Sequence, residues 1–398
     1  MTMTHMDKFK PRLDEIQRLA NAIDRHKTDL MEAAAYDAGF PVKITSIEVD
    51  LSADHLRTMD KEIPWVENCQ SYGTVATIFP YDAPTVVLAR FGGAALLTGN
   101  TLRFSLSSQT PRSASVLAEI CKPFRSIQPV VGMDNREFGR HCVADKDIRL
   151  FFISGASAVG EVYRREHNSF DKLFFAGPGG MPAAIVFEDA DVTAAASFIA
   201  RRAFINGGQY CTTLKKAYIH RSLYEEVRKD ILDRVQRLKV GDAFDPKTDI
   251  GPIRVERTRN ILQNALDKCG SARLVTGTID GETVFPLVLE TENTDIPDLE
   301  LFGPFLLLKP FDDPDEAVME LVKTRYGFLL SFFGSPAEKI KALFYSHFGM
   351  VHDNPDFTFT PLRLPFGGKK ASGWILERKG NNWIERDGAF IYSKELAT

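Results

Sequence analysis

From Gly73 onward the chain alternates short apolar runs with segments of helical periodicity, and this alternation limits the possible folds more than any other feature. The apolar runs are rich in β-branched and aromatic residues, as is typical of buried strands. Strands are expected at 75–79, 101–104, 129–131 and 148–153, with helices at 113–122 and 158–165. Strands that alternate with helices usually form a parallel sheet with helices on both faces. The sequence therefore predicts an α/β fold with a doubly wound sheet.

A second set of elements of the same kind follows. Strands at 183–187 and 217–220, with a helix at 192–203, indicate a second α/β unit. Before the first strand, apolar residues at helical spacing within 12–36 predict one or two amphipathic helices that end near Gly39. A chain of 398 residues is also long enough for two or three domains.

Composition and charge argue against several classes of protein. The formal net charge is -4 and no block of lysine and arginine occurs, so neither nucleic acid nor a membrane surface is an expected partner. No apolar run reaches the roughly 18 residues of a membrane helix, and residues 1–12 lack the apolar stretch of a signal peptide. The five cysteines form no C-x-x-C pair or Cys/His cluster, so we expect reduced thiols and no metal. A soluble, cytoplasmic protein is expected.

One cysteine stands in a chemically suggestive setting. Cys211 follows an apolar run and the turn-forming segment Asn206-Gly207-Gly208-Gln209. A thiolate is the strongest side-chain nucleophile near neutral pH, and flanking backbone N–H groups can hold the oxyanion that forms when it attacks a carbonyl. An isolated cysteine is more often a small buried apolar residue. Because an asparagine, two glycines and a glutamine precede Cys211, we interpret it as a catalytic nucleophile.

The pattern F-x-N-x-G-Q-x-C at 204–211 resembles the nucleophile segment of the aldehyde dehydrogenase superfamily, and the resemblance extends over nearly the whole chain. Further stretches match that superfamily in order. They are Ile250-Gly251-Pro252, Glu300-Leu301-Phe302-Gly303-Pro304, Tyr326-Gly327-Phe328, Asp353-Asn354-Pro355 and the segment from Pro365 to Gly373. Each stretch is weak alone, but the ordered set carries the resemblance.

This resemblance implies an aldehyde dehydrogenase-like α/β fold with a Rossmann-like cofactor domain, an α/β catalytic domain and a small oligomerisation hairpin. Residues 1–180 would form the cofactor-binding domain, 181–380 the catalytic domain and 381–398 the C-terminal oligomerisation strand. The first part of the hairpin would lie near 56–71, with its partner strand at 389–394. A homo-oligomer, either a dimer or a tetramer, is expected.

The resemblance also implies a site for NAD or NADP. A glycine-containing strand-to-helix turn at 152–160 would hold the pyrophosphate, while Glu300 and Phe302 match residues that bind the nicotinamide ribose and pack against the ring. Ser105 and Ser108 replace a ribose-binding lysine and a glutamate that disfavours NADP, so the choice of cofactor stays open. The expected cofactor residues are Ile78, Phe79, Pro80, Ser105, Ser108, Gly155, Ala156, Val159, Glu300 and Phe302.

In this superfamily the thiolate attacks an aldehyde, and the resulting thiohemiacetal loses a hydride to the cofactor and becomes a thioester. Hydrolytic relatives then use a glutamate as general base, but the matching position here is Gly177. The stretch around Gly177 instead resembles one in coenzyme A-acylating members, which also lack that glutamate. The acceptor of the acyl group therefore stays open.

The oxyanion-binding asparagine of the superfamily falls on Asp82. A carboxylate accepts hydrogen bonds rather than donating them, and loss of one such donor lowers turnover about 100- to 1000-fold. Burial could raise the pKa of Asp82 so that it donates as an acid, or Asp82 could replace the base that is missing at Gly177. Capping of a helix is an equal alternative.

We therefore expect an NAD(P)-dependent aldehyde dehydrogenase with Cys211 as nucleophile and Asp82 as a second catalytic candidate. Three hypotheses stay open. Water could accept the acyl group and give a carboxylic acid, or coenzyme A could accept it, with the reverse reduction also possible. In the third, the chain is an impaired aldehyde dehydrogenase fold that only binds ligands. The particular aldehyde is not identified.

Overall fold

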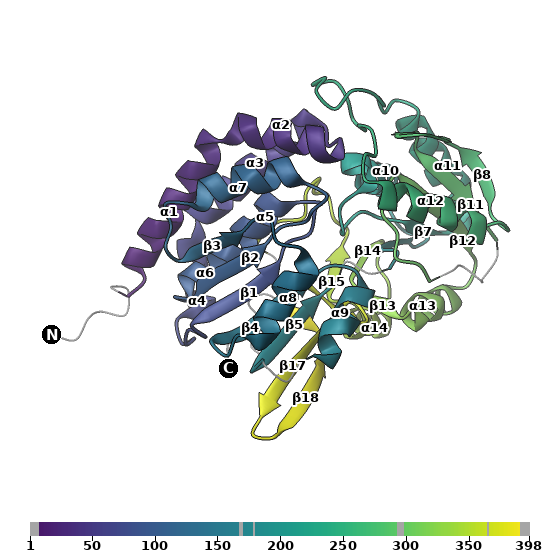
Figure 1. Cartoon of the computed structure of the whole chain (residues 1–398). Coiled ribbons are helices and arrows are strands. Elements are labelled where there is room, and N and C mark those ends of the chain that lie inside the picture. The colour runs from purple at the N-terminus through teal and green to yellow at the C-terminus, as the bar shows by residue number, and fades with distance from the viewer. Residues whose placement is uncertain (1–7, 167–169, 178–179, 293–297, 364–365, 391–398) are drawn as a thin grey trace.

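The computed structural model describes residues 8–166, 170–177, 180–292, 298–363 and 366–390. Two seven-stranded sheets form the body of the molecule, and the N-terminal helices cover the first of them (Figure 1). These helices are α1 (Lys10–Arg25), α2 (Lys27–Ala38) and α3 (Val42–Arg57). Their apolar residues recur at helical spacing and are buried, so the predicted N-terminal helices are confirmed.

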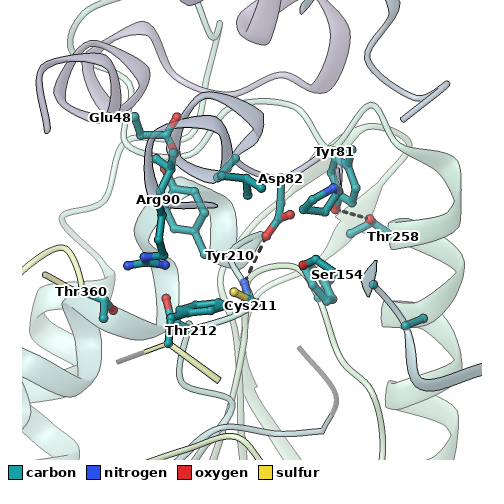
Figure 2. Close-up of a pocket in the computed structure, with 18 of the residues that line it drawn as sticks. Glu48, Tyr81, Asp82, Arg90, Ser154, Tyr210, Cys211, Thr212, Thr258 and Thr360 are labelled. Carbon is teal, nitrogen blue, oxygen red and sulfur yellow. Dashed lines mark hydrogen bonds between the residues drawn. The ribbon is translucent and has the colours of Figure 1, made fainter. Parts of the chain in front are cut away.

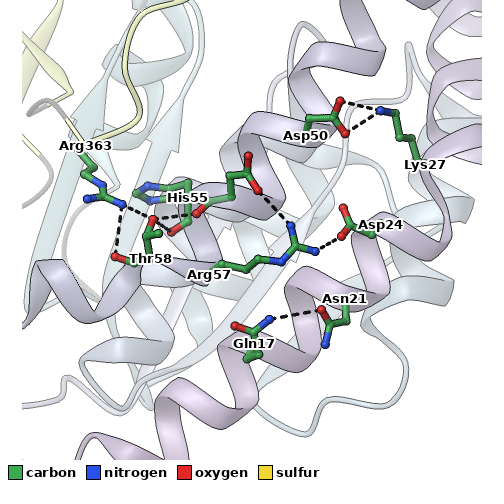
Figure 3. Close-up of polar contacts among 10 residues, drawn as sticks. Gln17, Asn21, Asp24, Lys27, Asp50, His55, Arg57, Thr58 and Arg363 are labelled. Atoms are coloured by element: carbon green, nitrogen blue, oxygen red, sulfur yellow. Dashed lines mark hydrogen bonds and ion pairs between the residues drawn. The ribbon is translucent and has the colours of Figure 1, made fainter.

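Polar contacts join the three N-terminal helices on their exposed side (Figure 3). Arg57 of α3 forms an ion pair with Asp24 of α1, and Lys27 of α2 contacts Asp50 of α3 at 2.6 Å. Such exposed pairs contribute little stability, so the buried apolar faces must hold these helices together. Arg363 also donates to Thr58, which anchors a C-terminal segment beside α3.

The first sheet has the order β18-β17-β5-β4-β1-β2-β3. Its parallel strands are β1 (Thr74–Ile78), β2 (Thr101–Ser105), β3 (Ile127–Val130), β4 (Ile148–Ser154) and β5 (Lys172–Ala176). The chain runs outward from β1 to β3 and then returns to β4 on the other side of β1. Ligands of such sheets usually bind at the carboxyl ends of the strands where the order reverses, here β1 and β4.

Helices cover both faces of the first sheet (Figure 1). Short helical segments follow β1 on the side of the N-terminal helices, while α8 and α9 lie on the opposite side. The short segments after β1 are α5 (Pro84–Val87), the π-helix η2 (Leu88–Gly92) and α6 (Gly93–Leu97). The longer helices of this unit are α7 (Pro111–Cys121), α8 (Asn135–Ala144) and α9 (Ser157–Arg165). The predicted alternation of strand and helix is thus confirmed in this unit.

The second sheet has the order β15-β14-β6-β7-β12-β11-β8, and all its pairs are parallel except β11 with β8. Its strands are β6 (Ala183–Val186), β7 (Lys216–His220), β8 (Arg273–Thr276), β11 (Leu287–Glu290), β12 (Phe305–Phe311), β14 (Leu329–Phe333) and β15 (Met350–Asp353). Its helices are α10 (Val192–Phe204), α11 (Arg221–Val235), α12 (Glu256–Lys268), α13 (Pro314–Lys323) and α14 (Glu338–His347). Central strands such as β12 are buried along their whole length, as expected for a parallel sheet covered on both faces.

Two small sheets complete the part of the fold that the structure describes. One is the hairpin of β9 (Ile279–Asp280) and β10 (Thr283–Val284). The other is antiparallel and joins β13 (Tyr326–Gly327), β16 (Gly367–Lys370) and β19 (Ala389–Phe390).

The expected first hairpin strand near 56–71 is wrong. After α3 the chain forms η1 (Met59–Glu62) and α4 (Ile63–Val66) instead. Met59, Ile63 and Val66 are buried at helical spacing in the main core, so their apolar side chains favour a helix over a strand. The structure instead forms a hairpin from β17 (Gly373–Lys379) and β18 (Asn382–Asp387), which extends from the first sheet (Figure 1).

This hairpin changes how the chain divides between the sheets. The expected boundary near residue 180 lies between β5 and β6 and hence between the two sheets. The expected boundary at 380 instead cuts through the β17–β18 hairpin, which pairs with β5. Residues 391–398, part of the expected C-terminal strand, lie outside the described residues, as does Pro365.

Candidate active site

A cavity of about 260 Å³ lies beyond the carboxyl ends of β1 and β4. Cys211 and Asp82 lie in its middle, with other residues on either side (Figure 2). The glycine end comprises Pro80, Tyr81, Ser154, Gly155, Ala156, Glu300 and Phe302, and the arginine end comprises Glu48, Arg90, Arg202, Tyr210, Thr212 and Thr360. Because both ends join at Cys211, one molecule at each end could meet at its sulfur.

A strained turn places Cys211. Helix α10 ends at Phe204, and Asn206 and Gly207 then adopt left-handed backbone angles, with φ values of 52° and 61°. Gly208 also has a positive φ of 67°, and a Cβ there would lie 2.1 Å from the backbone oxygen of Gly303. Only glycine fits that position.

The same turn is tied to the segment that carries Glu300 and Phe302. The Gly303 N–H donates to the Gly208 oxygen at 2.9 Å. The buried Lys215 Nζ donates to the oxygens of Gly208 and Gly303 at 2.8 and 2.6 Å. These contacts explain why the cysteine segment and the Glu-Leu-Phe-Gly-Pro segment occur together, since each requires the other to pack.

Asp82 contacts the backbone of the cysteine. Its carboxylate accepts the Cys211 N–H at 3.3 Å (Figure 2). Burial raises the pKa of Asp82 to about 6, while backbone hydrogen bonds partly oppose this rise. Burial and the charge of Asp82 raise the pKa of the Cys211 thiol far above its usual range, whereas Arg90 and Arg202 lower it. At neutral pH, Asp82 is therefore mainly ionised, Cys211 is a thiol, and a carboxylate occupies the position of the expected oxyanion donor.

A second buried carboxyl group lies at the arginine end. Glu48 of α3 accepts a hydrogen bond from the Tyr210 hydroxyl, and Tyr210 directly precedes the cysteine. Burial raises the pKa of Glu48 to about 8, because desolvation outweighs the hydrogen bond from Tyr210. Sequence reasoning missed Glu48. The available signal was an acidic residue among the buried positions of α3, such as Thr45 and Ser52.

Two buried guanidinium groups complete the arginine end, and sequence reasoning missed both. Arg202 of α10 donates to the oxygens of Thr358 and Thr212 at 2.7 and 2.8 Å and to the Thr360 hydroxyl at 3.1 Å. Arg90 of η2 lies over the ring of Phe366, 4.4 Å from its centroid. A basic residue within an apolar helical run was the signal for Arg202.

The glycine end contains half of the expected cofactor residues. Pro80, Gly155, Ala156, Glu300 and Phe302 all line the cavity. An added Cβ at Gly155 would meet no atom within 4 Å, so open space lies above the strand-to-helix turn, as a pyrophosphate would require. Glu300 now accepts the Ser157 N–H at 2.8 Å and the Ser157 hydroxyl at 2.7 Å, at the N-terminus of α9.

The other expected cofactor residues do not line the cavity. Ile78 and Phe79 are buried in the core, where Phe79 stacks on Phe104 with centroids 4.4 Å apart. Val159 packs against the core of the first sheet. The Ser105 hydroxyl bonds to Asn135 at 2.7 Å, and Ser108 is exposed. Their roles in cofactor binding stay predictions.

Packing leaves no room for a glutamate at Gly177. A Cβ there would lie 2.5 Å from the Phe175 ring and 3.0 Å from the Gly155 oxygen. Position 177 therefore departs from the hydrolytic pattern, and the packing at the end of β5 favours glycine there.

Within the described ranges, no group of three or more His, Cys, Asp or Glu side chains could hold a metal ion. No described helix combines the length and apolarity needed to cross a membrane.

The model of the aldehyde dehydrogenase family matches residues 5–386. The chain belongs to this family. Its sequence identity to individual relatives is low. A 3-sulfolactaldehyde dehydrogenase of Priestia megaterium is 26% identical over 92% of this chain and 82% of that protein. A probable succinate-semialdehyde dehydrogenase [NADP(+)] of Sinorhizobium fredii is 28% identical over 92% of this chain and 80% of that protein.

Solved structures share the fold. HpcC from Thermus thermophilus has a TM-score of 0.82 and 26% identity, over 94% of this chain and 78% of that one. An NAD+ complex of an aldehyde dehydrogenase from Bacillus cereus also has a TM-score of 0.82, with 23% identity over 98% of this chain and 84% of that one. The chain is thus an NAD(P)-dependent aldehyde oxidoreductase, and the predicted family, fold class, activity and cofactor class are confirmed.

Proposed function

We propose that this enzyme oxidises a small aldehyde to a carboxylic acid, with Cys211 as nucleophile, Asp82 as base and water as acyl acceptor. The hydrogen bond between Asp82 and the Cys211 N–H, in the middle of a cavity with two distinct ends, carries this proposal. Asp82 thus combines the two roles that the sequence left as alternatives.

The first step concerns the cysteine proton. The Asp82 carboxylate takes the proton of the Cys211 thiol, and the thiolate forms a bond to the aldehyde carbon. Asp82 becomes a neutral acid, so it no longer repels the thiolate. It also releases the Cys211 N–H. That N–H and the new Asp82 O–H can then both donate to the oxyanion, in place of the missing asparagine.

The second step removes a hydride. A nicotinamide cofactor held at the glycine end would accept the hydride that the thiohemiacetal loses, so that Cys211 then carries a thioester. Glu300 would leave Ser157, which frees the N-terminus of α9 for the cofactor pyrophosphate and lets Glu300 reach the nicotinamide ribose. The ring of Phe302, whose centroid lies 6.3 Å from that of Tyr81, would pack against the nicotinamide.

The third step hydrolyses the thioester. Asp82 first loses its proton to solvent and then takes a proton from water, whose oxygen attacks the acyl carbon. The thiolate leaves and takes the proton back from Asp82, which restores the starting enzyme and releases the acid. Glu48 is a second candidate base, since its pKa of about 8 places it near neutral pH and it lines the same cavity.

Coenzyme A is the alternative acceptor, and one observation favours it. The position of the hydrolytic glutamate is Gly177, where packing leaves no room for a glutamate side chain. An enzyme without that base could transfer its acyl group to a thiol instead.

One experiment separates the acceptors and tests whether the protein only binds ligands. A panel of aldehydes is mixed with NAD or NADP, with and without coenzyme A, and the absorbance of the reduced cofactor is followed. Sustained turnover without coenzyme A supports hydrolysis. A single burst that coenzyme A converts to turnover supports acylation. If no aldehyde gives a signal and no electrophile labels Cys211, both enzyme proposals fail.

The names of the relatives leave the substrate open. They include 3-sulfolactaldehyde, sulfoacetaldehyde and succinate semialdehyde, which carry an anionic group, but also lactaldehyde, which does not. These aldehydes share a short carbon chain, which suits a cavity of about 260 Å³. We take short aliphatic aldehydes as the substrate class.

We further propose that the enzyme forms a homo-oligomer through the β17–β18 hairpin. Strand β18 ends the first sheet, so its outer edge has no strand partner within the described residues, and Ile384 on it is exposed. Light scattering on the wild type and on Ile384→Lys tests this, because a charge at the edge should weaken the assembly. The cytoplasmic location stays a prediction.

A further inference from the structure

The arginine end of the cavity contains a buried cation that faces a space large enough for a ligand. Arg202 is 2% exposed and lines the cavity from α10. Its three hydrogen-bond acceptors are neutral oxygens, and it forms no ion pair with any residue that the structure describes. Fully buried arginines are normally paired with an anion. An anion is therefore the ligand that would compensate Arg202.

A second cation lines the same cavity. Arg90 is 6% exposed, and Phe366 supports its guanidinium from one face. Its side chain points toward Thr360 and Thr212, the two threonines that also accept hydrogen bonds from Arg202 (Figure 2). Two planar guanidinium groups with nearby hydroxyls form a donor set suited to a carboxylate or a sulfonate.

Three carboxyl groups line the cavity: Glu300 at the glycine end, and Glu48 and Asp82, which reduce the positive charge of the arginine end. Glu48 is bound to Tyr210 and is mainly protonated at pH 7, since its pKa is about 8. Asp82 is mainly ionised and lies beside Cys211 rather than beyond it (Figure 2). The two arginines therefore outweigh the one ionised carboxylate, and the arginine end keeps an excess of positive charge.

We propose that the arginine end selects short aldehydes that carry a carboxylate or a sulfonate at the far end of the chain, with Arg90 and Arg202 binding that anion. This rests on the proposed function, since the aldehyde carbon must lie at Cys211. The anion then fixes the carbonyl between the thiol and the glycine end. Arg90 and Arg202 are the residues that determine specificity.

Kinetics with matched substrates test this. Succinate semialdehyde and sulfoacetaldehyde carry the anion, and butanal is a neutral four-carbon control. For the wild type we expect kcat/KM to be higher with either anion than with butanal. In Arg90→Met, this preference should fall about 10- to 100-fold, mainly through KM, because a charged hydrogen-bond donor is lost. The readout is the ratio of kcat/KM for the anionic aldehyde to kcat/KM for butanal. Arg90 also lowers the pKa of Cys211, so Arg90→Met slows the reaction with both substrates, and only the ratio isolates the effect on the anion.

Two variants and a binding measurement complete the test. Arg90→Lys should recover part of the preference, whereas Arg237→Met, at an exposed position outside the cavity lining, should leave the ratio unchanged. Calorimetry with succinate reports anion binding without turnover, and we expect Arg90→Met to weaken it. A ratio that Arg90→Met does not change overturns the proposal, while turnover of butanal preserves the proposed function. Succinate binding without oxidation of any aldehyde would support the anion site and overturn the proposed function.

Discussion

The two ends of the cavity are built in different ways. The glycine end depends largely on backbone, namely the turn between β4 and α9 and the segment at 300–304, which is hydrogen-bonded to the cysteine turn. The arginine end depends on side chains from α3, η2 and α10, which are far apart in the sequence. The first end suits a constant ligand such as a dinucleotide, and the second can vary without disturbing the fold. Under the proposed function, cofactor binding and substrate choice therefore lie on opposite sides of the Cys211 sulfur.

Removal of that sulfur should have the largest effect, because both ends act through it. We expect Cys211→Ala to lower turnover with every aldehyde by more than about 10⁴-fold, whichever acceptor is used. Absorbance of the reduced cofactor measures the loss. Cofactor binding, followed by calorimetry, should persist because the glycine end is unchanged. Turnover at the wild-type rate in Cys211→Ala would show that the two ends do not meet at this residue.

Asp82 lies between the two ends and should have the next largest effect. As a base it must be ionised, so kcat/KM should rise with pH and level off above the Asp82 pKa of about 6. In Asp82→Asn this rise should disappear, and the rate at pH 8 should fall about 100- to 1000-fold. Asp147→Asn, at an exposed position, is the matched control. If Asp82→Asn is as active as the wild type, the side chain serves only as an oxyanion contact.

Glu48, at the arginine end, should affect the pH dependence of protein stability rather than the reaction rate. Its pKa in the folded protein, about 8, is above the usual value of 4.5, so the folded state holds a proton that the unfolded state releases between these values. The Glu48 carboxyl group therefore stabilises the wild type at low pH, and this contribution is lost as pH rises toward 8. In Glu48→Gln the unfolding free energy does not change with pH through this position, because glutamine does not ionise.

Chemical denaturation of the two proteins at pH 5 and pH 8 measures the effect. The unfolding free energy of Glu48→Gln relative to the wild type should rise between these pH values by on the order of 4 kcal/mol. Glu226→Gln, at an exposed site, is the control. Parallel curves for wild type and Glu48→Gln would mean that Glu48 is ionised in the folded protein, which would remove the excess of positive charge from the arginine end.

Sequence reasoning found the glycine end better than the arginine end, for a physical reason. Gly155, Glu300 and Phe302 lie in contiguous segments whose backbone must follow one path, so short patterns mark them. Glu48 and Arg202 lie on helices, where the pattern predicts which face is buried but not which cavity that face meets. Tertiary packing decides that second point.

The same limit explains the other differences between expectation and structure. Ser105 ends β2, one residue beyond the predicted strand at 101–104, and its hydroxyl bonds to Asn135 of α8, a contact that no short pattern encodes. Residues 59–66, within the expected hairpin segment at 56–71, are helical because their apolar side chains fit the main core. The sequence predicts Cys211 and Asp82 as residues of one catalytic site, and a hydrogen bond joins them in the structure, but their catalytic roles stay predictions.

The smallest expected effect compares two glycines at the glycine end. In Gly177→Ala the new Cβ meets the Phe175 ring at 2.5 Å, so we expect a loss of about 1–3 kcal/mol of stability, seen as a lower Tm. In Gly155→Ala the Cβ meets open space, so Tm should change little, whereas KM for the cofactor should rise because the methyl group occupies the pyrophosphate position. Equal losses of Tm in the two variants would mean that Gly155 is also retained for packing. Glycine at position 155 would then be required only for packing, as it is in the cysteine turn. The open space above Gly155 would no longer support a cofactor at the glycine end.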